Sequence, residues 1–95
     1  MTYYKKRVDN NQLEIIKAFQ SMGATVLNLS GVGKGCPDLL IGYKNKHSVL
    51  VEVKSKTGKF TEPQLKFMEQ WQGGAVNRID SVDGAIRLIK LLDIS

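Results

Sequence analysis

Three charged residues lie within two apolar segments near the middle of the chain. Asp38 opens the segment "DLLIGYK", and Glu52 and Lys54 lie near the end of "HSVLVEVK" in an E-x-K arrangement. Removing a charged side chain from water is costly unless the charge is paired or bound to an ion. Charges placed inside such apolar segments therefore indicate a chemical role.

The two segments predict a β-hairpin that turns at residues 45–46. Alternate side chains of a strand share a face, so Glu52 and Lys54 project together. Folding the hairpin brings Asp38 opposite residues 52–54 as their cross-strand neighbour. We therefore expect the three charges to converge at one end of a sheet. The opposite face, on which a helix could pack, carries Val49, Val51 and Val53.

Two converging carboxylates suit a hard divalent cation such as Mg²⁺ or Mn²⁺, which keeps waters or phosphate oxygens in its remaining positions. A neighbouring lysine can orient or deprotonate a metal-bound water and can offset charge that develops on a phosphate. Together these groups are typical of metal-assisted phosphodiester hydrolysis. A zinc centre is not indicated, because His47 and Cys36 are each isolated in the sequence. The alternative is an ion-pair cluster that merely stabilises the sheet.

The composition is that of one ordinary globular domain with a basic excess. The chain has 95 residues, 42% of them hydrophobic, and a formal net charge of +5. This excludes a disordered chain and suits a polyanionic partner, nucleic acid above all. The single cysteine excludes an internal disulfide, and no stretch resembles a signal peptide or a membrane span. We therefore expect an intracellular, cytoplasmic protein with no membrane partner.

The remaining elements follow from hydrophobic periodicity and from capping residues. The sequence predicts a basic arm over residues 1–8, helices over 10–22, 62–72 and 81–94, and strands over 24–30, 38–44, 47–54 and 75–79. The order α-β-β-β-α-β-α predicts an α/β domain with a mixed β-sheet flanked by helices. Phe67 and Trp71, spaced i,i+4 on the second helix, are interpreted as core residues. The apolar surface of the C-terminal helix is wide for one small sheet to bury, which favours oligomerisation.

The combined motif has a known counterpart. "PD" at 37–38 followed by "EVK" at 52–54 resembles the PD-(D/E)xK nuclease signature. A first helix that carries Glu14, a glycine-rich loop before "PDLLIG" and the later "TEPQLKFMEQW" resemble the VRR-NUC branch, especially its stand-alone phage-type members. The resemblance covers residues 10–92 and implies one VRR-NUC-like nuclease domain over 1–95 with a restriction-endonuclease-like core.

The resemblance also implies a catalytic set, which consists of Glu14, Asp38, Glu52, Lys54 and Gln64. Asp38, Glu52 and the backbone carbonyl of Val53 would hold the divalent metal, and Lys54 would position or activate the attacking water.

The two outer members of this set would have supporting roles. Gln64 would add a polar contact, and Glu14 would hydrogen-bond Lys54 or a metal-bound water. The phage-type relatives are thought to act as homodimers that resemble Holliday-junction resolvases. By this resemblance the chain would be a homodimer and, if phage-encoded, would work in the host cytoplasm.

Backbone N–H groups and cations near the motif predict contacts with DNA phosphates. The loop before Asp38 is rich in glycine, and the residues after Lys54 are basic. This loop is not a P-loop, because Pro37 and a strand follow it where a helix is required. The predicted DNA contacts are Ser30, Gly33, Lys34, Gly35, Lys56 and Lys59.

The function expected from these observations is a divalent-metal-dependent DNA endonuclease, with branched or duplex DNA as its partner. Its selectivity for one DNA structure, such as a four-way junction, is left open by the sequence, as is the choice between one metal and two. The first alternative is a non-catalytic DNA-binding module that retains the nuclease fold. The second is a structural domain whose charge cluster rigidifies the sheet, which predicts negligible affinity for DNA.

Overall fold

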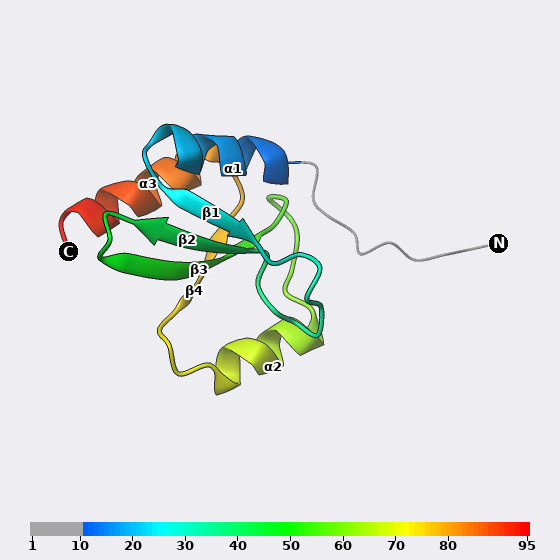
Figure 1. The fold of residues 1–95 in the computed structure, drawn as a ribbon. Coiled ribbons are helices and arrows are strands. Elements are labelled where there is room, and N and C mark those ends of the chain that lie inside the picture. The colour runs from blue at the N-terminus through cyan, green and yellow to red at the C-terminus, as the bar shows by residue number, and fades with distance from the viewer. Residues whose placement is uncertain (1–10) are drawn as a thin grey trace.

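A computed structural model describes residues 11–95, and the arm predicted over residues 1–8 lies outside them. The sheet has four strands in the order β1-β2-β3-β4. The strands are β1 (Thr25–Asn28), β2 (Leu39–Tyr43), β3 (His47–Val53) and β4 (Val76–Ile79). Pairing is antiparallel between β1 and β2 and between β2 and β3, whereas β3 and β4 are parallel. The sheet is therefore mixed, as predicted (Figure 1).

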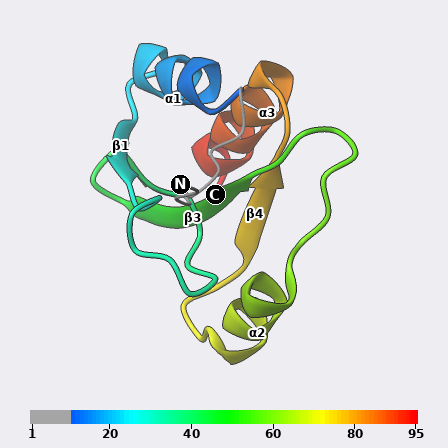
Figure 2. The same ribbon diagram turned by 90° about the vertical axis from the view of Figure 1, so that its right-hand side faces the viewer.

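Two helices cover one face of this sheet. They are α1 (Gln12–Ser21) and α3 (Val82–Asp93), which lie side by side in Figures 1 and 2. Their buried residues include Ile15, Phe19 and Ile89, and these pack with Val51 and Val53 in one hydrophobic cluster. The predicted valine face is thus the core face, because alternate strand residues point to the same side. Glu52 and Lys54 are left to the other face.

The third helix, α2 (Glu62–Gln70), lies apart from α1 and α3 on the other side of the sheet (Figure 2). Thr61 begins it with a capping box, as expected of threonine at this position. No residue of α2 is buried, and Trp71, just past its end, is 44% exposed. The prediction that Phe67 and Trp71 belong to the core was therefore wrong. Their rings stack on each other instead, with centroids 5.3 Å apart.

Short turns connect α1 to β1 and β2 to β3, and left-handed residues mark both of them. Gly23, with φ of 90°, follows α1 and returns the chain to β1. Lys44 and Asn45 join β2 to β3 with φ values of 54° and 52°. Two left-handed residues in a tight hairpin match the twist of the strands. Within residues 11–95 no helix is both long enough and apolar enough to cross a membrane.

Candidate active site

The predicted charges gather where four chain segments meet at one end of the sheet. The register pairs Asn28 with Leu39 at the end of β1 and the start of β2. It also pairs Val53 with Ile79 at the ends of β3 and β4. In the β2–β3 register Leu39 faces Val51, so one further step brings Asp38 opposite Glu52. Cβ atoms of such cross-strand partners are about 4.5–5.5 Å apart.

Asp38 is held from two sides. Its backbone carbonyl accepts a hydrogen bond of 2.7 Å from the Leu29 N–H. Its carboxylate Oδ2 accepts one of 2.8 Å from the Val53 N–H. The other oxygen, Oδ1, has no hydrogen-bond donor among residues 11–95. The side chain is therefore fixed through one oxygen and can offer the second one to a ligand.

Pro37 lies just before Asp38, where the paired residues of β2 and β3 end, and its ring has a consequence for the Val53 carbonyl. The β2–β3 register, continued past Leu39 and Val51, sets Pro37 opposite Val53. In an antiparallel ladder only alternate partners exchange N–H···O bonds, and the N–H and the carbonyl of one strand residue point to the same side. The Lys54 N–H points to β4 and the Val53 N–H points to the β2 side, so the Val53 carbonyl faces the β2 side too. Proline has no N–H to donate. The Asp38 carboxylate takes the Val53 N–H, and the Val53 carbonyl is left facing the same side with no ladder donor.

Glu52 and Lys54 complete the cluster from the end of β3. Glu52 is only 2% exposed, although a carboxylate is rarely tolerated so deep unless it is paired, hydrogen-bonded or bound to a cation. The Lys54 N–H donates to the Ile79 carbonyl at 3.0 Å, which ties it to β4. The Lys54 ammonium lies over the Phe60 ring, 5.8 Å from its centroid, and this contact steadies a long flexible side chain.

Two carboxamides at the start of α1 support the same end of the sheet. The Asn11 Nδ2 donates to the carbonyls of Lys54 and Asp80, at 3.1 and 3.0 Å, and so joins the ends of β3 and β4. The Gln12 Nε2 donates to Ser30 Oγ at 3.0 Å, and Gln12 is 3% exposed. Sequence reasoning missed both residues. Polar residues at the start of a helix are normally expected to face solvent, and the hydrogen-bond partners of these two residues are distant in the sequence.

The predicted phosphate loop lies between β1 and Asp38. Its first residue, Ser30, donates its N–H to the Asn28 side chain at 2.9 Å. Gly33, Lys34 and Gly35 all have positive φ, of 77°, 57° and 81°. Gly35 lies so close to α2 that a Cβ there would be 2.2 Å from the Pro63 carbonyl oxygen. The loop therefore rests directly on the N-terminus of α2.

The two outer members of the predicted catalytic set are engaged differently. The Gln64 Oε1 accepts a hydrogen bond of 2.8 Å from the Thr61 N–H and closes the capping box of α2. Its amide nitrogen is the group left for a contact with the site. Glu14 is exposed and has no hydrogen bond or ion pair among residues 11–95; it lines a shallow groove with Val82 and Ile86. The catalytic roles of Gln64 and Glu14 stay predictions.

The oxygen atoms at this site fit a hard cation. The accessible Asp38 oxygen, the Glu52 carboxylate and the Val53 carbonyl would supply the oxygen ligands that Mg²⁺ prefers. Within the described part of the chain, no three or more His, Cys, Asp or Glu side chains are grouped so as to hold a metal ion. The predicted set therefore consists of two carboxylates and one backbone oxygen, and a bound cation would complete its coordination with waters and substrate oxygens.

The basic residues after Lys54 are fixed by an arginine that sequence reasoning did not single out. The Arg78 guanidinium forms a 2.9 Å ion pair with Asp80 and donates to carbonyls of the loop that follows Lys54. Its hydrogen bond lowers the pKa of Asp80 below the usual value of 3.8. Asp80 therefore stays ionised and keeps the Arg78 side chain in place near neutral pH.

Comparison with known proteins identifies the fold that carries this site. A protein-family model described as VRR-NUC domain matches residues 4–77, well over half of the chain. The chain belongs to the VRR-NUC family. A solved structure named "VRR_NUC domain" is 28% identical, with a TM-score of 0.67 over 83% of this chain and 89% of that one. No curated protein matches the chain.

Membership in the VRR-NUC family has two consequences. It confirms the resemblance drawn from the PD and E-x-K motifs, and the solved neighbour agrees with the mixed α/β sheet and its three helices. A VRR-NUC domain is a nuclease-type domain, for which DNA is the expected substrate. The converging carboxylates thus lie in a domain of a nuclease family.

Proposed function

We propose that this VRR-NUC domain is a divalent-metal-dependent endonuclease that hydrolyses phosphodiester bonds in DNA. The hydrogen bond from the Val53 N–H to Asp38 Oδ2 is the observation that carries the proposal. It gathers a carboxylate and a backbone carbonyl beside the buried Glu52, and a lone surface ion pair would need no such arrangement. The basic net charge of +5 suits the substrate.

The proposed metal ligands are Asp38, Glu52 and the Val53 carbonyl. Mg²⁺ or Mn²⁺, when bound there, would polarise the scissile phosphate and make a bound water more acidic. Lys54, whose charge suits the role, would orient that water and offset charge on the phosphate. The glycine-rich loop and its Lys34 would hold a phosphate of the strand through N–H groups and one cation.

Cleavage assays test this proposal. Labelled four-way junction, flap, single-stranded and duplex DNA are incubated with the protein and Mg²⁺, Mn²⁺ or EDTA. We expect metal-dependent cutting that falls at least about 100-fold in Asp38→Ala and Lys54→Ala, the loss typical of a group that stabilises a transition state. Lys90→Ala, which removes an exposed α3 cation, serves as the matched control.

The assays also separate the alternatives. Binding of DNA with no cutting in any metal would support the non-catalytic binding module. If the protein neither binds nor cuts DNA, the cluster of charged residues has only a structural role. If one DNA form is cut in preference to the others, the enzyme is structure-selective, and equal cutting of all forms contradicts selectivity.

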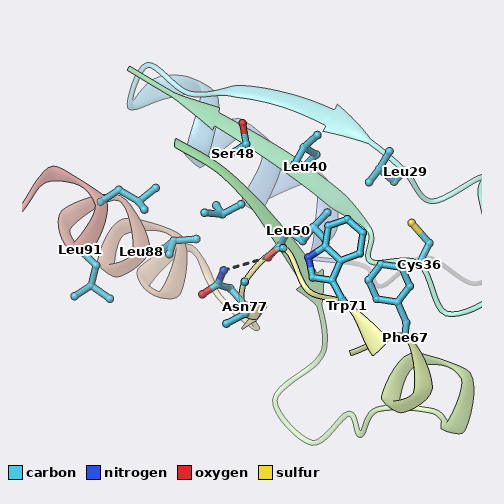
Figure 3. Close-up of a pocket in the computed structure, with 15 residues that line it drawn as sticks. Leu29, Cys36, Leu40, Ser48, Leu50, Phe67, Trp71, Asn77, Leu88 and Leu91 are labelled. Atoms are coloured by element: carbon cyan, nitrogen blue, oxygen red, sulfur yellow. Dashed lines mark hydrogen bonds between the residues drawn. The ribbon is translucent and has the colours of Figure 1, made fainter. Parts of the chain in front are cut away.

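We further propose that the protein is a homodimer joined through the sheet face opposite α1 and α3. A groove of about 750 Å³ runs from that face past β4 to the side of α3, and its lining includes Leu40, Leu50, Phe67, Trp71, Leu88 and Leu91 (Figure 3). None of its lining residues is charged, which disfavours nucleic acid as the occupant.

The state of α2 favours a second copy as the occupant. A nine-residue helix with no buried side chain gains little stability from its own chain. Covering Trp71 and Leu91, which are 44% and 59% exposed, would supply the missing burial.

Mass measurements test the dimer. Light scattering across a dilution series should give twice the chain mass for the wild type and the single-chain mass for Trp71→Glu. Leu27→Glu changes a residue that is 56% exposed on β1 and outside the groove, so it should remain dimeric. A wild type that stays monomeric at all concentrations contradicts this proposal.

A further inference from the structure

The loop that follows Lys54 is organised around one guanidinium group. Arg78 donates through NH2 to the carbonyls of Ser55 at 2.9 Å, Lys56 at 3.4 Å and Gly58 at 3.0 Å. Through NH1 it binds Asp80 at 2.9 Å. Three carbonyls of one short loop therefore point inward to the same cation.

Carbonyls that point inward leave the neighbouring N–H groups pointing outward. In a trans peptide the C=O and the following N–H point in opposite directions, and the described chain has no cis peptide bond. The N–H groups of Lys56, Thr57 and Lys59 therefore face away from Arg78. Among residues 11–95 none of these three has a hydrogen-bond acceptor, and all three residues are exposed.

Outward N–H groups and positive charge together form an anion site. The loop presents the three N–H groups, the Thr57 hydroxyl and the ammonium groups of Lys56 and Lys59. Clustered backbone N–H groups of this kind bind phosphate. Carboxylate neighbours would weaken such a site, but Asp80 is already neutralised by its ion pair with Arg78.

The place of the loop relates this anion site to the proposed active site. Residues 55–59 directly follow Lys54, and Phe60 at their end lies beneath the Lys54 ammonium. The parallel register pairs Arg78 with Glu52, so the two side chains leave the sheet on the same face. A phosphate held by the loop would therefore be close in the chain to Lys54 and on the side of the sheet that carries Glu52.

We propose that residues 55–59 form a second phosphate clamp for the DNA backbone, and that Arg78 is the positioning residue that shapes it. The clamp rests on the proposed function, because its ligand is a backbone phosphate near the one that is cut. It goes beyond the two lysines singled out from sequence, since the backbone N–H groups make the specific contacts. Arg78 itself acts through the loop and touches no DNA.

Binding assays without catalysis test the clamp. Fluorescence anisotropy with a short labelled duplex in EDTA, over a range of KCl concentrations, would compare the wild type with Arg78→Lys and Arg78→Met. Lysine keeps the charge but cannot reach three carbonyls at once. We expect both variants to bind about tenfold more weakly and to lose about one unit of salt slope, as for one lost phosphate contact. Arg87→Met, an exposed α3 variant that removes the same charge, should change affinity less than about twofold.

Three results would overturn the clamp. Arg78→Lys binding like the wild type would show that charge alone matters, and equal losses in Arg78→Met and Arg87→Met would show the same. If the Arg78 variants unfold, NMR spectra of the wild type are compared with and without the duplex in EDTA. Amide signals of Lys56, Thr57 and Lys59 should then shift, and unmoved signals contradict the clamp. These binding measurements contain no metal, so they do not depend on cleavage. A failure to cut DNA in the separate assays with metal would contradict the proposed function and leave the clamp untouched.

Discussion

At the scale of single residues, Pro37 matters because it has no backbone N–H to donate to a neighbouring carbonyl. Opposite it, the Val53 carbonyl keeps its lone pairs available at the candidate metal site. Pro37→Ala would restore a ladder donor to that carbonyl. We expect about a tenfold loss in Mg²⁺ affinity, measured by calorimetry, because one of the three proposed oxygen ligands is then engaged elsewhere. Pro63→Ala in the first turn of α2 is the matched control, and equal affinities in both variants would contradict this role for Pro37.

The motif residues could be predicted because they belong to one hairpin, so their positions in the sequence determine which of them lie close together. Asp38, Glu52 and Lys54 lie on one hairpin, whose register follows from strand alternation and a short turn. This reasoning could not find Asn11, Gln12 and Arg78. The partner of Gln12 lies 18 residues away in the sequence, and one partner of Asn11 lies 69 residues away. Side chains that act through distant carbonyls leave no local pattern.

At the scale of elements, the glycine-rich loop and α2 depend on their contact. Gly35→Ala places a Cβ 2.2 Å from the Pro63 carbonyl oxygen and forces alanine into a φ of +81°. We expect a loss of at least about 1–3 kcal/mol in the free energy of unfolding from the backbone strain alone. Urea unfolding measures it. Gly31→Ala, which meets nothing within 4 Å at ordinary φ, should change stability by less than about 0.5 kcal/mol.

Element positions in the sequence were predicted well, whereas the packing of α2 was not. The cap at Thr61 and the glycine after α1 indicated where one helix begins and another ends. Phe67 and Trp71 have helical spacing, which predicts a shared face but not what covers it. In the described chain that face meets an open groove, so the core interpretation failed.

At the scale of the whole molecule, the end of α3 is tied to the β2–β3 turn. Asp93 Oδ1 accepts hydrogen bonds from Lys44 at 2.8 Å and Tyr43 at 2.7 Å. These bonds, the one from Lys44 foremost, lower the pKa of Asp93 below 3.8, while Asp93 raises the pKa of Lys44 and of Tyr43. The carboxylate therefore binds a proton less readily in the folded state.

The sign of the pH effect follows from that lowered pKa. The stability contributed by Asp93 is present above its unfolded value and is lost as the pH falls through the folded one. In urea unfolding, the wild type should exceed Asp93→Asn in stability at about pH 6, and the gap should close toward about pH 2. A constant gap over that range would contradict the assignment, and Asp83→Asn, an exposed residue, is the control.

The parallel pairing of β3 with β4 has a consequence for the order in which the protein becomes competent during synthesis. A chain emerging from the ribosome exposes the hairpin with Asp38, Glu52 and Lys54 early, and that hairpin can form by local contacts alone. The Lys54 N–H finds its partner only when Ile79 has been made, and the following loop is shaped only by Arg78. A nascent chain therefore carries every motif residue while its site is still incomplete, so cutting of DNA would begin only after the last quarter of the chain has folded.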